Sequence, residues 1–249
     1  MKHAEGAPIL VLSPHLDDAV LSTWSVIAGP HEVVVLNVFA GVPEQDFVPR
    51  WDRLAGADDS TSHMEARLSE DRAALALAGR SAIYLPLLER HYRNGDPDGE
   101  QVATALRGAV PAASLLFAPA GIGGHEDHVL VRDLAIELSR RIRLPLCLYA
   151  ELPYAARFGW PSWVSGAPPD PAVVVDVDWE SALSGAPVAR SALSSRVRRL
   201  DDEQMSAKLA AMKRYRTQFP LLNQGPIGFL EHPLVLPFEV AWSVITDRR

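Results

Sequence analysis

Residues 13–22 read Ser-Pro-His-Leu-Asp-Asp-Ala-Val-Leu-Ser and follow directly on the apolar run of residues 8–12. The continuous hydrophobicity of that run predicts a strand buried on both faces, and apolar residues then recur at helical spacing from residue 20 to residue 27. The histidine and the two aspartates of the stretch are therefore expected at a strand-to-helix turn. In an open α/β sheet this turn lies at the carboxyl end of a strand, where ligands bind, although an aspartate there can also serve only as a helix cap.

The alternation of strand and helix continues along the chain. Residues 32–40 are rich in β-branched side chains and predict a second buried strand. Further strands are expected at residues 82–88, 114–118 and 145–151, and helices at residues 64–79, 101–110 and 129–141. Because every connection is long enough to contain a helix, the pattern favours an α/β fold with a doubly wound, mainly parallel, Rossmann-like sheet and helices on both faces.

The sequence becomes irregular after residue 153. Residues 154–171 are rich in proline and tryptophan, a strand is expected at residues 173–177, a long amphipathic helix at residues 201–219 and a last strand at residues 240–245. We expect a single domain over residues 1–249, with an α/β core at about residues 7–153 and a C-terminal extension at about residues 154–249.

Composition and charge exclude several classes of partner. The 249 residues carry a formal net charge of −7, and the densest basic group, Arg196 with Arg198 and Arg199, is interpreted as a solvated helix face. Nucleic acid is therefore not an expected partner. No apolar stretch approaches the roughly 18 residues of a membrane span and no signal-peptide pattern is present, so we expect a cytoplasmic protein without stable membrane insertion. The single Cys147 excludes an intrachain disulfide, and a homo-oligomer is left open.

A second polar cluster follows the strand expected at residues 114–118. Its glycine-rich loop does not match a dinucleotide-binding fingerprint, because Glu126 occupies the position of the third glycine. What remains is His125-Glu126-Asp127-His128, in which two histidines three residues apart at a helix start face the same way, as do His15 and Asp18. Imidazole and carboxylate donors without a thiolate suit Zn²⁺ with an open position for water.

These two segments resemble the PIG-L (LmbE-like) family of zinc-dependent N-deacetylases, whose motifs are an HPDD-type strand end and an HPDH- or HxDH-type loop. They stand here as Pro14-His15-Leu16-Asp17-Asp18 and His125-Glu126-Asp127-His128. Leu16 replaces the commoner proline of the first motif, and Ala19 stands where many members have glutamate. The resemblance covers residues 7–153 and, loosely, residues 200–220.

The resemblance implies a function for each polar residue of the two motifs. His15, Asp18 and His128 would be the ligands of one zinc ion per chain, and Asp17 would be the general base. His125 would stabilise the tetrahedral oxyanion, with Asp127 orienting it. Bound zinc lowers the pKa of a water molecule to about 7 and polarises an amide carbonyl, so the implied reaction is amide hydrolysis.

Three further residues are expected at a substrate pocket. Arg67 faces the substrate if the long loop of residues 41–62 folds over the site. Trp51 in that loop and Trp160 in the segment of residues 154–171 are either core residues or part of an aromatic wall for a sugar ring. The histidines at positions 31, 63, 91 and 232 carry no spacing signal and are expected at the surface or in structural hydrogen bonds.

The leading hypothesis is a zinc-dependent hydrolase that releases acetate from a small-molecule N-acetylated amino sugar or glycoconjugate. An alternative within the hydrolases is an amidase acting on a larger sugar-linked amide, such as a thiol conjugate. An alternative from a different class is a non-catalytic sugar- or nucleotide-binding module. Asp17 argues against the module, since binding alone does not need a base beside the ligands.

Overall fold

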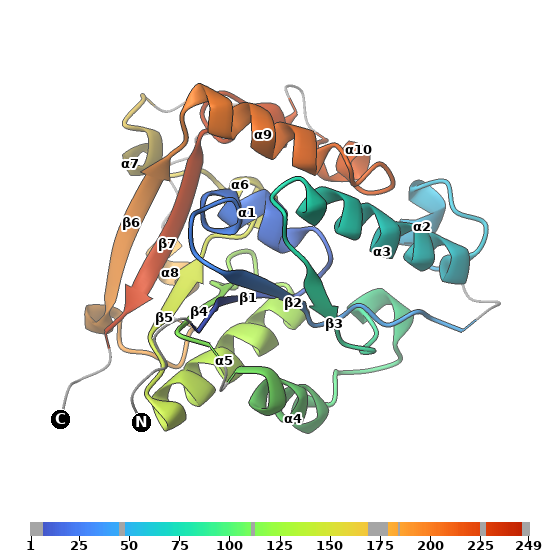
Figure 1. Cartoon of the computed structure of the whole chain (residues 1–249), viewed down its shortest axis with the longest axis horizontal. Helices are drawn as coiled ribbons and strands as arrows, with labels where there is room; N and C mark the ends of the chain where they lie inside the picture. The colour runs from blue at the N-terminus through green and yellow to red at the C-terminus, as the bar shows by residue number, and fades with distance from the viewer. Residues whose placement is uncertain are drawn as a thin grey trace.

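The computed structural model describes residues 7–44, 48–110, 113–168, 179–183, 185–224 and 228–245. Their strands form one seven-stranded sheet in the order β3-β2-β1-β4-β5-β7-β6 (Figure 1). The strands are β1 (Ile9–Ser13), β2 (Val33–Asn37), β3 (Ala82–Tyr84), β4 (Leu115–Pro119), β5 (Leu146–Tyr149), β6 (Leu193–Arg199) and β7 (Phe238–Val244). Strands β1 to β5 pair in parallel, which confirms the predicted α/β fold with a mainly parallel sheet.

The order of the strands creates a switch point at β1. The chain leaves β1 toward β2 on one side of it, and it later returns on the other side as β4. The loops that follow β1 and β4 therefore diverge at the carboxyl edge of the sheet, where open α/β sheets bind their ligands. The two polar motifs of the sequence are these two loops.

Helices cover both faces of the sheet (Figure 1). The longer ones are α1 (Asp18–Ile27), α3 (Ser60–Ala76) and α9 (Asp202–Met212), which pack together on one face, and α4 (Gly99–Ala109) and α5 (Glu126–Ile142) on the other. The short ones are α2 (Arg50–Leu54), α6 (Tyr154–Phe158), α7 (Ser162–Ser165), α8 (Trp179–Leu183) and α10 (Phe219–Leu222), with single 3-10 turns at Arg90–Tyr92, Arg190–Ala192 and Phe229–Glu231. None of the helices in this described part of the chain has both the length and the apolar character needed to cross a bilayer.

The C-terminal part of the chain is fastened to α1 by a buried carboxylate. Helix α1 is interrupted at Thr23, where φ is −136° and ψ is 30°. Glu239 of β7 accepts hydrogen bonds from the backbone N–H groups of Trp24 (2.8 Å) and Ser25 (3.0 Å), and Lys208 of α9 donates to the same carboxylate at 3.0 Å. Lys208 is fully buried, and an unpaired buried charge is strongly destabilising. The pairing with Glu239 offsets this cost.

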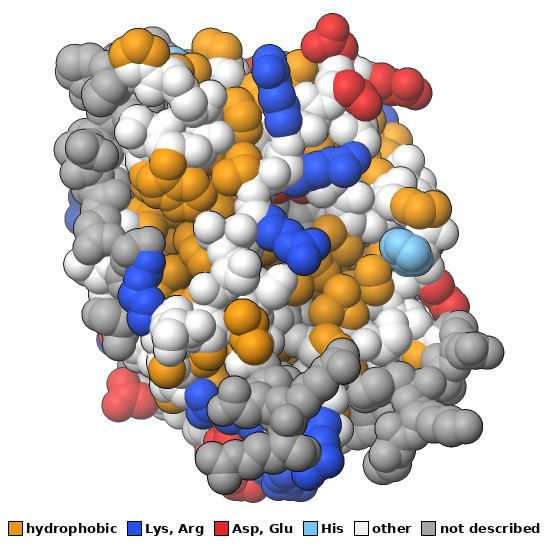
Figure 2. Space-filling view, turned by 90° about the vertical axis from the view of Figure 1, so that its left-hand side faces the viewer, with side chains coloured by type: hydrophobic (Ala, Val, Ile, Leu, Met, Phe, Trp, Pro, Cys, Tyr) orange, Lys and Arg blue, Asp and Glu red, His pale blue; other side chains and the backbone are white. Residues whose placement is uncertain are grey.

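Strand β6 corrects the expected helix face at Arg196, Arg198 and Arg199. These residues lie in an edge strand that pairs antiparallel with β7. Residues 194–199 are all exposed, so the strand lacks the in-and-out hydrophobic alternation by which strands are recognised. The face of the molecule on this side shows basic side chains beside hydrophobic ones (Figure 2). Charged side chains on an exposed edge also hinder pairing with other chains.

The helix expected at residues 201–219 is also shorter than predicted. It ends at Met212, and α10 begins separately at Phe219 with Pro220 in its first turn. Proline has no N–H to continue a helix, so it is tolerated in a first turn and not in a helix interior. The strand expected at residues 240–245 is present as β7, whereas the strand expected at residues 173–177 lies outside the described residues.

Candidate active site

The first polar turn, between β1 and α1, is held by hydrogen bonds of Ser13, and the Asp17 side chain does not cap the helix. The Ser13 hydroxyl donates to the carbonyl of His15 (2.5 Å) and accepts from the N–H of Ala19 (3.0 Å). Asp17 occupies the N-cap position of α1, but its side chain makes no capping hydrogen bond. The carboxylate of Asp18 instead accepts from the backbone N–H of His15 at 2.9 Å. The Asp17 carboxylate is thus left available for another function.

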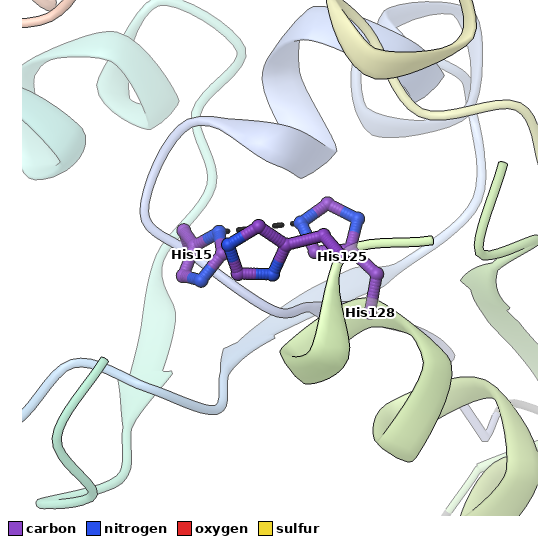
Figure 3. Close-up of side chains that lie close together, drawn as sticks. All are labelled: His15, His125 and His128. Carbon is purple, nitrogen blue, oxygen red and sulfur yellow. Dashed lines mark hydrogen bonds between the residues drawn. The ribbon is translucent and has the colours of Figure 1, made fainter. Parts of the chain in front are cut away.

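The second polar turn, which follows β4, brings His128 next to His15 (Figure 3). Nδ1 of His15 lies 3.3 Å from Oδ2 of Asp18, Nε2 of His128 lies 3.2 Å from that oxygen, and the two ring nitrogens are 3.2 Å apart. Donors held 2.0–2.1 Å from a tetrahedral Zn²⁺ ion are separated by about 3.3 Å from one another. The three atoms therefore have the spacing of one face of a zinc tetrahedron.

A wider triad, His15 with His125 and His128, also has nitrogens that lie within 4.8 Å of one another. The set containing Asp18 is more compact, and its spacing is closer to that of zinc ligands. We therefore favour His15, Asp18 and His128 as the donor set and leave His125 beside it.

The outer nitrogen of each of these two histidines contacts a buried carboxylate. Asp127 Oδ2 lies 3.0 Å from Nε2 of His15, and Glu151 Oε1 lies 3.3 Å from Nδ1 of His128. An ionised carboxylate can only accept hydrogen bonds, so the outer nitrogens carry protons, and the inner nitrogens would bind a metal ion once they give up theirs. Histidines that bind metals in proteins are commonly held in this way.

The position of Asp127 corrects the expectation that it orients His125. Its carboxylate contacts His15, the backbone N–H of Arg90 (3.0 Å) and the guanidinium of Arg93. Asp127 lies in the first turn of α5, and its position two residues after His125 suggested that residue as its partner. The topology of the sheet instead brings the turn after β1, with His15, within reach of Asp127.

The electrostatics of the cluster favour a cation. Burial alone would suppress the charge of His128, but Asp18 and Glu151 outweigh it and raise the pKa of His128 to about 9. Burial likewise opposes the charge of His15, while Glu89, Asp127 and Asp18 raise its pKa well above the ordinary value. The same imidazoles lower the pKa of Asp18 in spite of its burial. A site that stabilises positive charge on imidazole would also stabilise a bound metal ion.

A cavity of about 310 Å³ opens beside this cluster and includes Asp17, Arg67 and His125 in its lining. Burial and the neighbouring Asp18 raise the pKa of Asp17 to about 6, while Arg67 acts in the opposite direction. Arg67 is itself buried and lies 2.7 Å from Oε1 of Glu89. Arg67 therefore lies in the lining of the cavity, but its charge is already paired with Glu89.

His125 stands at the border between the cluster and the cavity. Its ring centroid lies 4.9 Å from that of His15 and 5.3 Å from that of Tyr154. Its Nδ1 atom is buried and has no hydrogen-bond partner in the structure. Burial and the charges of His15 and His128 lower the pKa of His125 to about 3, so the free protein holds it neutral. A neutral imidazole can still donate one N–H.

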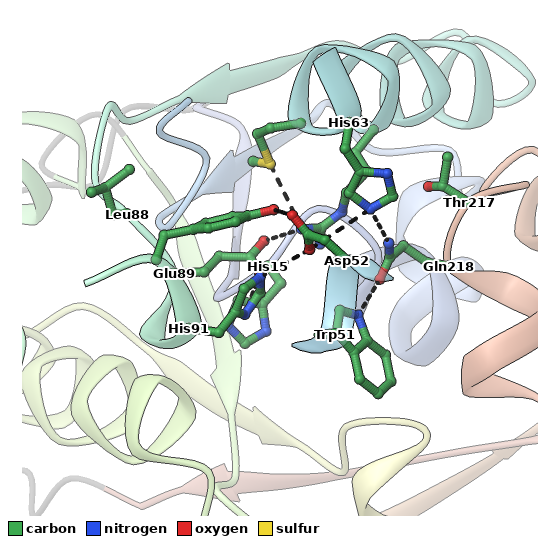
Figure 4. A network of polar contacts seen from close by, with 12 residues as sticks. His15, Trp51, Asp52, His63, Leu88, Glu89, His91, Thr217 and Gln218 are labelled. Atoms are coloured by element: carbon green, nitrogen blue, oxygen red, sulfur yellow. Dashed lines mark hydrogen bonds and ion pairs between the residues drawn. The ribbon is translucent and has the colours of Figure 1, made fainter. Parts of the chain in front are cut away.

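Helix α2 places Trp51 in the cavity lining, and hydrogen bonds hold this part of the chain in place (Figure 4). The next residue, Asp52, points into the interior, where Ser60 Oγ (2.6 Å) and Tyr92 Oη (2.8 Å) donate to it. The indole N–H of Trp51 donates to Gln218 Oε1 at 2.9 Å. The loop of residues 41–62 thus contributes a held aromatic residue to the pocket.

Trp160 is a core residue, which corrects its expected place on a pocket wall. It is 1% exposed and packs edge-on against Trp179, with ring centroids 5.2 Å apart. The cavity lining does not include it. Tyr154 and Pro153, a few residues earlier, line the cavity instead.

Several lining residues were not predicted as site residues, namely Glu89, His91, Tyr154, Arg157 and Gln218. His91 lies 3.6 Å from Asp52 and 3.5 Å from Glu89 through its two ring nitrogens. These residues come from short helices and turns without periodic patterns, so sequence spacing could not select them. Glu151 had one signal, because it is the last residue of the strand predicted at residues 145–151 and therefore falls at the same sheet edge.

The chain is similar in sequence and in structure to known deacetylases. No family model matches the sequence. The 2'-N-acetylparomamine deacetylase of Streptomyces fradiae is 33% identical over 168 residues, which are 59% of this chain and 58% of that protein, so the match spans less than two thirds of that relative's length. The solved structure of teicoplanin deacetylase Orf2 in a zinc-inhibited form is 26% identical, with 97% of this chain and 99% of that chain covered at a TM-score of 0.74.

The A40926 pseudoaglycone deacetylase Dbv21 is 28% identical, with 97% of this chain and 98% of that chain covered at a TM-score of 0.70. The similarity to these solved structures therefore extends over nearly the whole chain. The chain has the α/β fold of these deacetylases.

Proposed function

We propose that the chain is a zinc-dependent hydrolase that removes the N-acetyl group from an amino sugar or glycoconjugate. The observation that carries the proposal is the triangle of His15 Nδ1, Asp18 Oδ2 and His128 Nε2, with sides of 3.2–3.3 Å, beside the uncommitted carboxylate of Asp17. The three donors would hold the zinc ion. When bound, the ion would supply Lewis acidity, which acidifies a water molecule and polarises the amide carbonyl.

Asp17 would act as the general base. It lines the cavity and is adjacent in sequence to the ligand Asp18, so it can reach a water molecule held at the site. Its carboxylate would take the proton of the attacking water and later give it to the departing amine. Such proton transfer contributes roughly 10²–10⁴-fold to a reaction rate.

His125 would stabilise the negative charge that develops on the carbonyl oxygen. Its neutral ring offers one N–H, and its buried Nδ1 has no partner in the free protein. One such donor is typically worth about 10²–10³-fold. Asp127 and Glu151 would act indirectly, by holding a proton on the outer nitrogens of His15 and His128 so that the inner nitrogens face the metal.

The cavity lining suits a sugar ring. Trp51 and Tyr154 contribute aromatic rings to its lining, and Arg67 and Asp17 line the same cavity. The relatives support this class of substrate, since their names describe deacetylation of acetylated paromamine, of teicoplanin and of the A40926 pseudoaglycone.

Acetate release by metal-free and zinc-loaded protein tests the proposal. Protein stripped with a chelator should release no acetate from N-acetylated amino sugars, and one equivalent of zinc should restore release. Zinc should not be added in excess, because teicoplanin deacetylase Orf2, which is similar to this chain, has a zinc-inhibited form. Activity that is equal in stripped and loaded protein, or no acetate from any of a broad panel of N-acetyl sugars, would contradict the proposal.

A further inference from the structure

The cavity lining includes a positively charged side chain, that of Arg157, which has no part in the proposed reaction. Arg157 lies in α6, is exposed, and lines the same cavity as Asp17 and His125. Among the described side chains, no carboxylate lies within ion-pair distance of its guanidinium. Arg67, in contrast, is buried and paired with Glu89 at 2.7 Å. Of these two arginines on the cavity wall, Arg157 is therefore the one whose charge is available.

The guanidinium of Arg157 is held in place by the protein backbone. Its Nη2 atom donates to the carbonyl oxygens of Leu221 (3.1 Å) and Leu222 (3.2 Å), at the C-terminal end of α10. The N–H groups on Nε and Nη1 make no hydrogen bond within the described part of the chain. A guanidinium fixed by neutral acceptors keeps its charge and loses less freedom on binding than a mobile side chain.

Arg157 lies apart from the residues that would bind the acetamido group of a substrate. Tyr154, one helical turn earlier, has its ring centroid 4.6 Å from that of His128 and 5.3 Å from that of His125. Arg157 contacts none of the proposed metal ligands and lies three residues after Tyr154 in α6, in the lining of the same cavity. A substrate whose acetamido group reaches His125 would thus extend past Tyr154 toward Arg157.

We infer that Arg157 binds an anionic group, a phosphate or a carboxylate, that the substrate carries away from its acetamido group. The inference rests on the proposed N-deacetylase function and makes it more specific, because the preferred substrate becomes an acidic amino sugar or glycoconjugate. Guanidinium binds both anions through charge-assisted hydrogen bonds. The structural alternative is that Arg157 serves only to satisfy the last carbonyls of α10.

The test compares three sugars with one acetamido group each: the methyl glycoside of N-acetylglucosamine, its 6-phosphate, and the carboxymethyl glycoside of N-acetylglucosamine. The wild-type protein should show a kcat/KM about tenfold higher for at least one charged sugar than for the neutral one, as expected for a charge-assisted contact. Whether the phosphate or the carboxylate is preferred identifies the anion. Arg157→Gln should remove the preference mainly through KM and leave the neutral sugar within about twofold.

Arg216→Gln is the matched control, because it removes one positive charge from a side chain that is 84% exposed and outside the cavity lining. It should keep the wild-type preference. A wild-type protein that treats charged and neutral sugars alike, or a preference that survives Arg157→Gln, would overturn the inference. A purely structural role predicts equal losses with all three sugars.

Two measurements keep the inference testable if a variant is unstable or turnover is absent. In the wild-type protein, KM for the charged sugar should rise between about 20 and 300 mM salt while KM for the neutral sugar stays constant, because salt screens an exposed charge pair. A KM for the charged sugar that does not change with salt would count against Arg157. If no sugar is hydrolysed, the proposed function fails by itself, and calorimetry with the corresponding free amines still compares charged with neutral binding in wild-type and Arg157→Gln protein.

Discussion

Nε2 of His15 lies 3.0 Å from Asp127, and Nδ1 of the same ring lies 3.3 Å from Asp18. Two carboxylates from different turns thus hold one imidazole from opposite sides. Since a carboxylate accepts and does not donate, the contact with Asp127 keeps a proton on Nε2, so loss of the other proton leaves the tautomer with a free lone pair on Nδ1. A metal ligand needs this tautomer, and the sheet topology that joins the ends of β1 and β4 provides it.

Asp127→Asn should therefore weaken zinc binding about 10–100-fold, the usual effect of losing the carboxylate behind a metal-binding histidine. Competition with a chelator of known affinity measures the loss. Glu126→Gln is the control, because Glu126 is the neighbouring acid, and its side chain is 53% exposed. Unchanged zinc affinity in Asp127→Asn would show that His15 does not depend on this contact.

Asp18→Asn and His125→Gln separate the two triads that the cluster allows. If the donors are His15, Asp18 and His128, Asp18→Asn should lose most of the bound zinc, whereas His125→Gln should keep one zinc per chain and lose activity. Elemental analysis of the purified proteins gives the answer. The reverse pattern would make the three histidines the ligands and would remove His125 from its catalytic role.

Asp17→Asn should keep the zinc and lose turnover by roughly 10²–10⁴-fold, because an amide preserves the shape of the side chain and cannot accept the proton. The loss should appear in kcat, with little change in KM. Steady-state kinetics with matched zinc content decides the question. A variant that retains more than about a tenth of the wild-type kcat is incompatible with a general base at this position.

Tyr215→Phe tests how the C-terminal extension supports the first turn. The Tyr215 hydroxyl lies 3.1 Å from the carbonyl oxygen of Leu16 and 2.7 Å from Oδ1 of Asp71. Its removal should cost about 1–3 kcal/mol in the free energy of unfolding, since buried acceptors lose a donor. Denaturant unfolding measures this cost.

Tyr84→Phe is the matched variant, because the Tyr84 hydroxyl donates to the same Asp71 carboxylate at 2.8 Å. Within the described part of the chain, the Tyr84 hydroxyl makes no hydrogen bond to the backbone of Leu16. Both variants should be destabilised, but only Tyr215→Phe should also lower kcat, through displacement of the turn that carries Asp17. Equal effects of the two variants on kcat would assign Tyr215 a role in stability alone.

The parallel half of the fold was predictable because its first strands, β1 and β2, are largely buried and read as continuous apolar runs. The runs before His15 and before the glycine loop gave β1 and β4 to within one or two residues. The antiparallel addition was not predictable in the same way. Strand β6 has no buried face to produce a pattern, and its three arginines resemble a solvated helix.

The candidate site was predictable where its residues follow strand ends, since parallel strands bring their carboxyl ends to one edge. This holds for His15, Asp17, Asp18, His125 and His128. Contacts between turns depend on side-chain reach, so the partner of Asp127 could not be inferred from its position beside His125. The burial of Trp160 against Trp179 likewise depends on how the irregular segment folds back, which aromatic composition does not specify.

Anomalous diffraction at the zinc absorption edge, from crystals of protein loaded with one equivalent of zinc, locates the metal and its ligands. We expect one strong peak within about 2.0–2.2 Å of Nδ1 of His15, a carboxylate oxygen of Asp18 and Nε2 of His128. The Asp17 carboxylate should lie beside the metal without binding it. A peak next to His125 in place of Asp18, or no peak in this cluster, would rule out this ligand set.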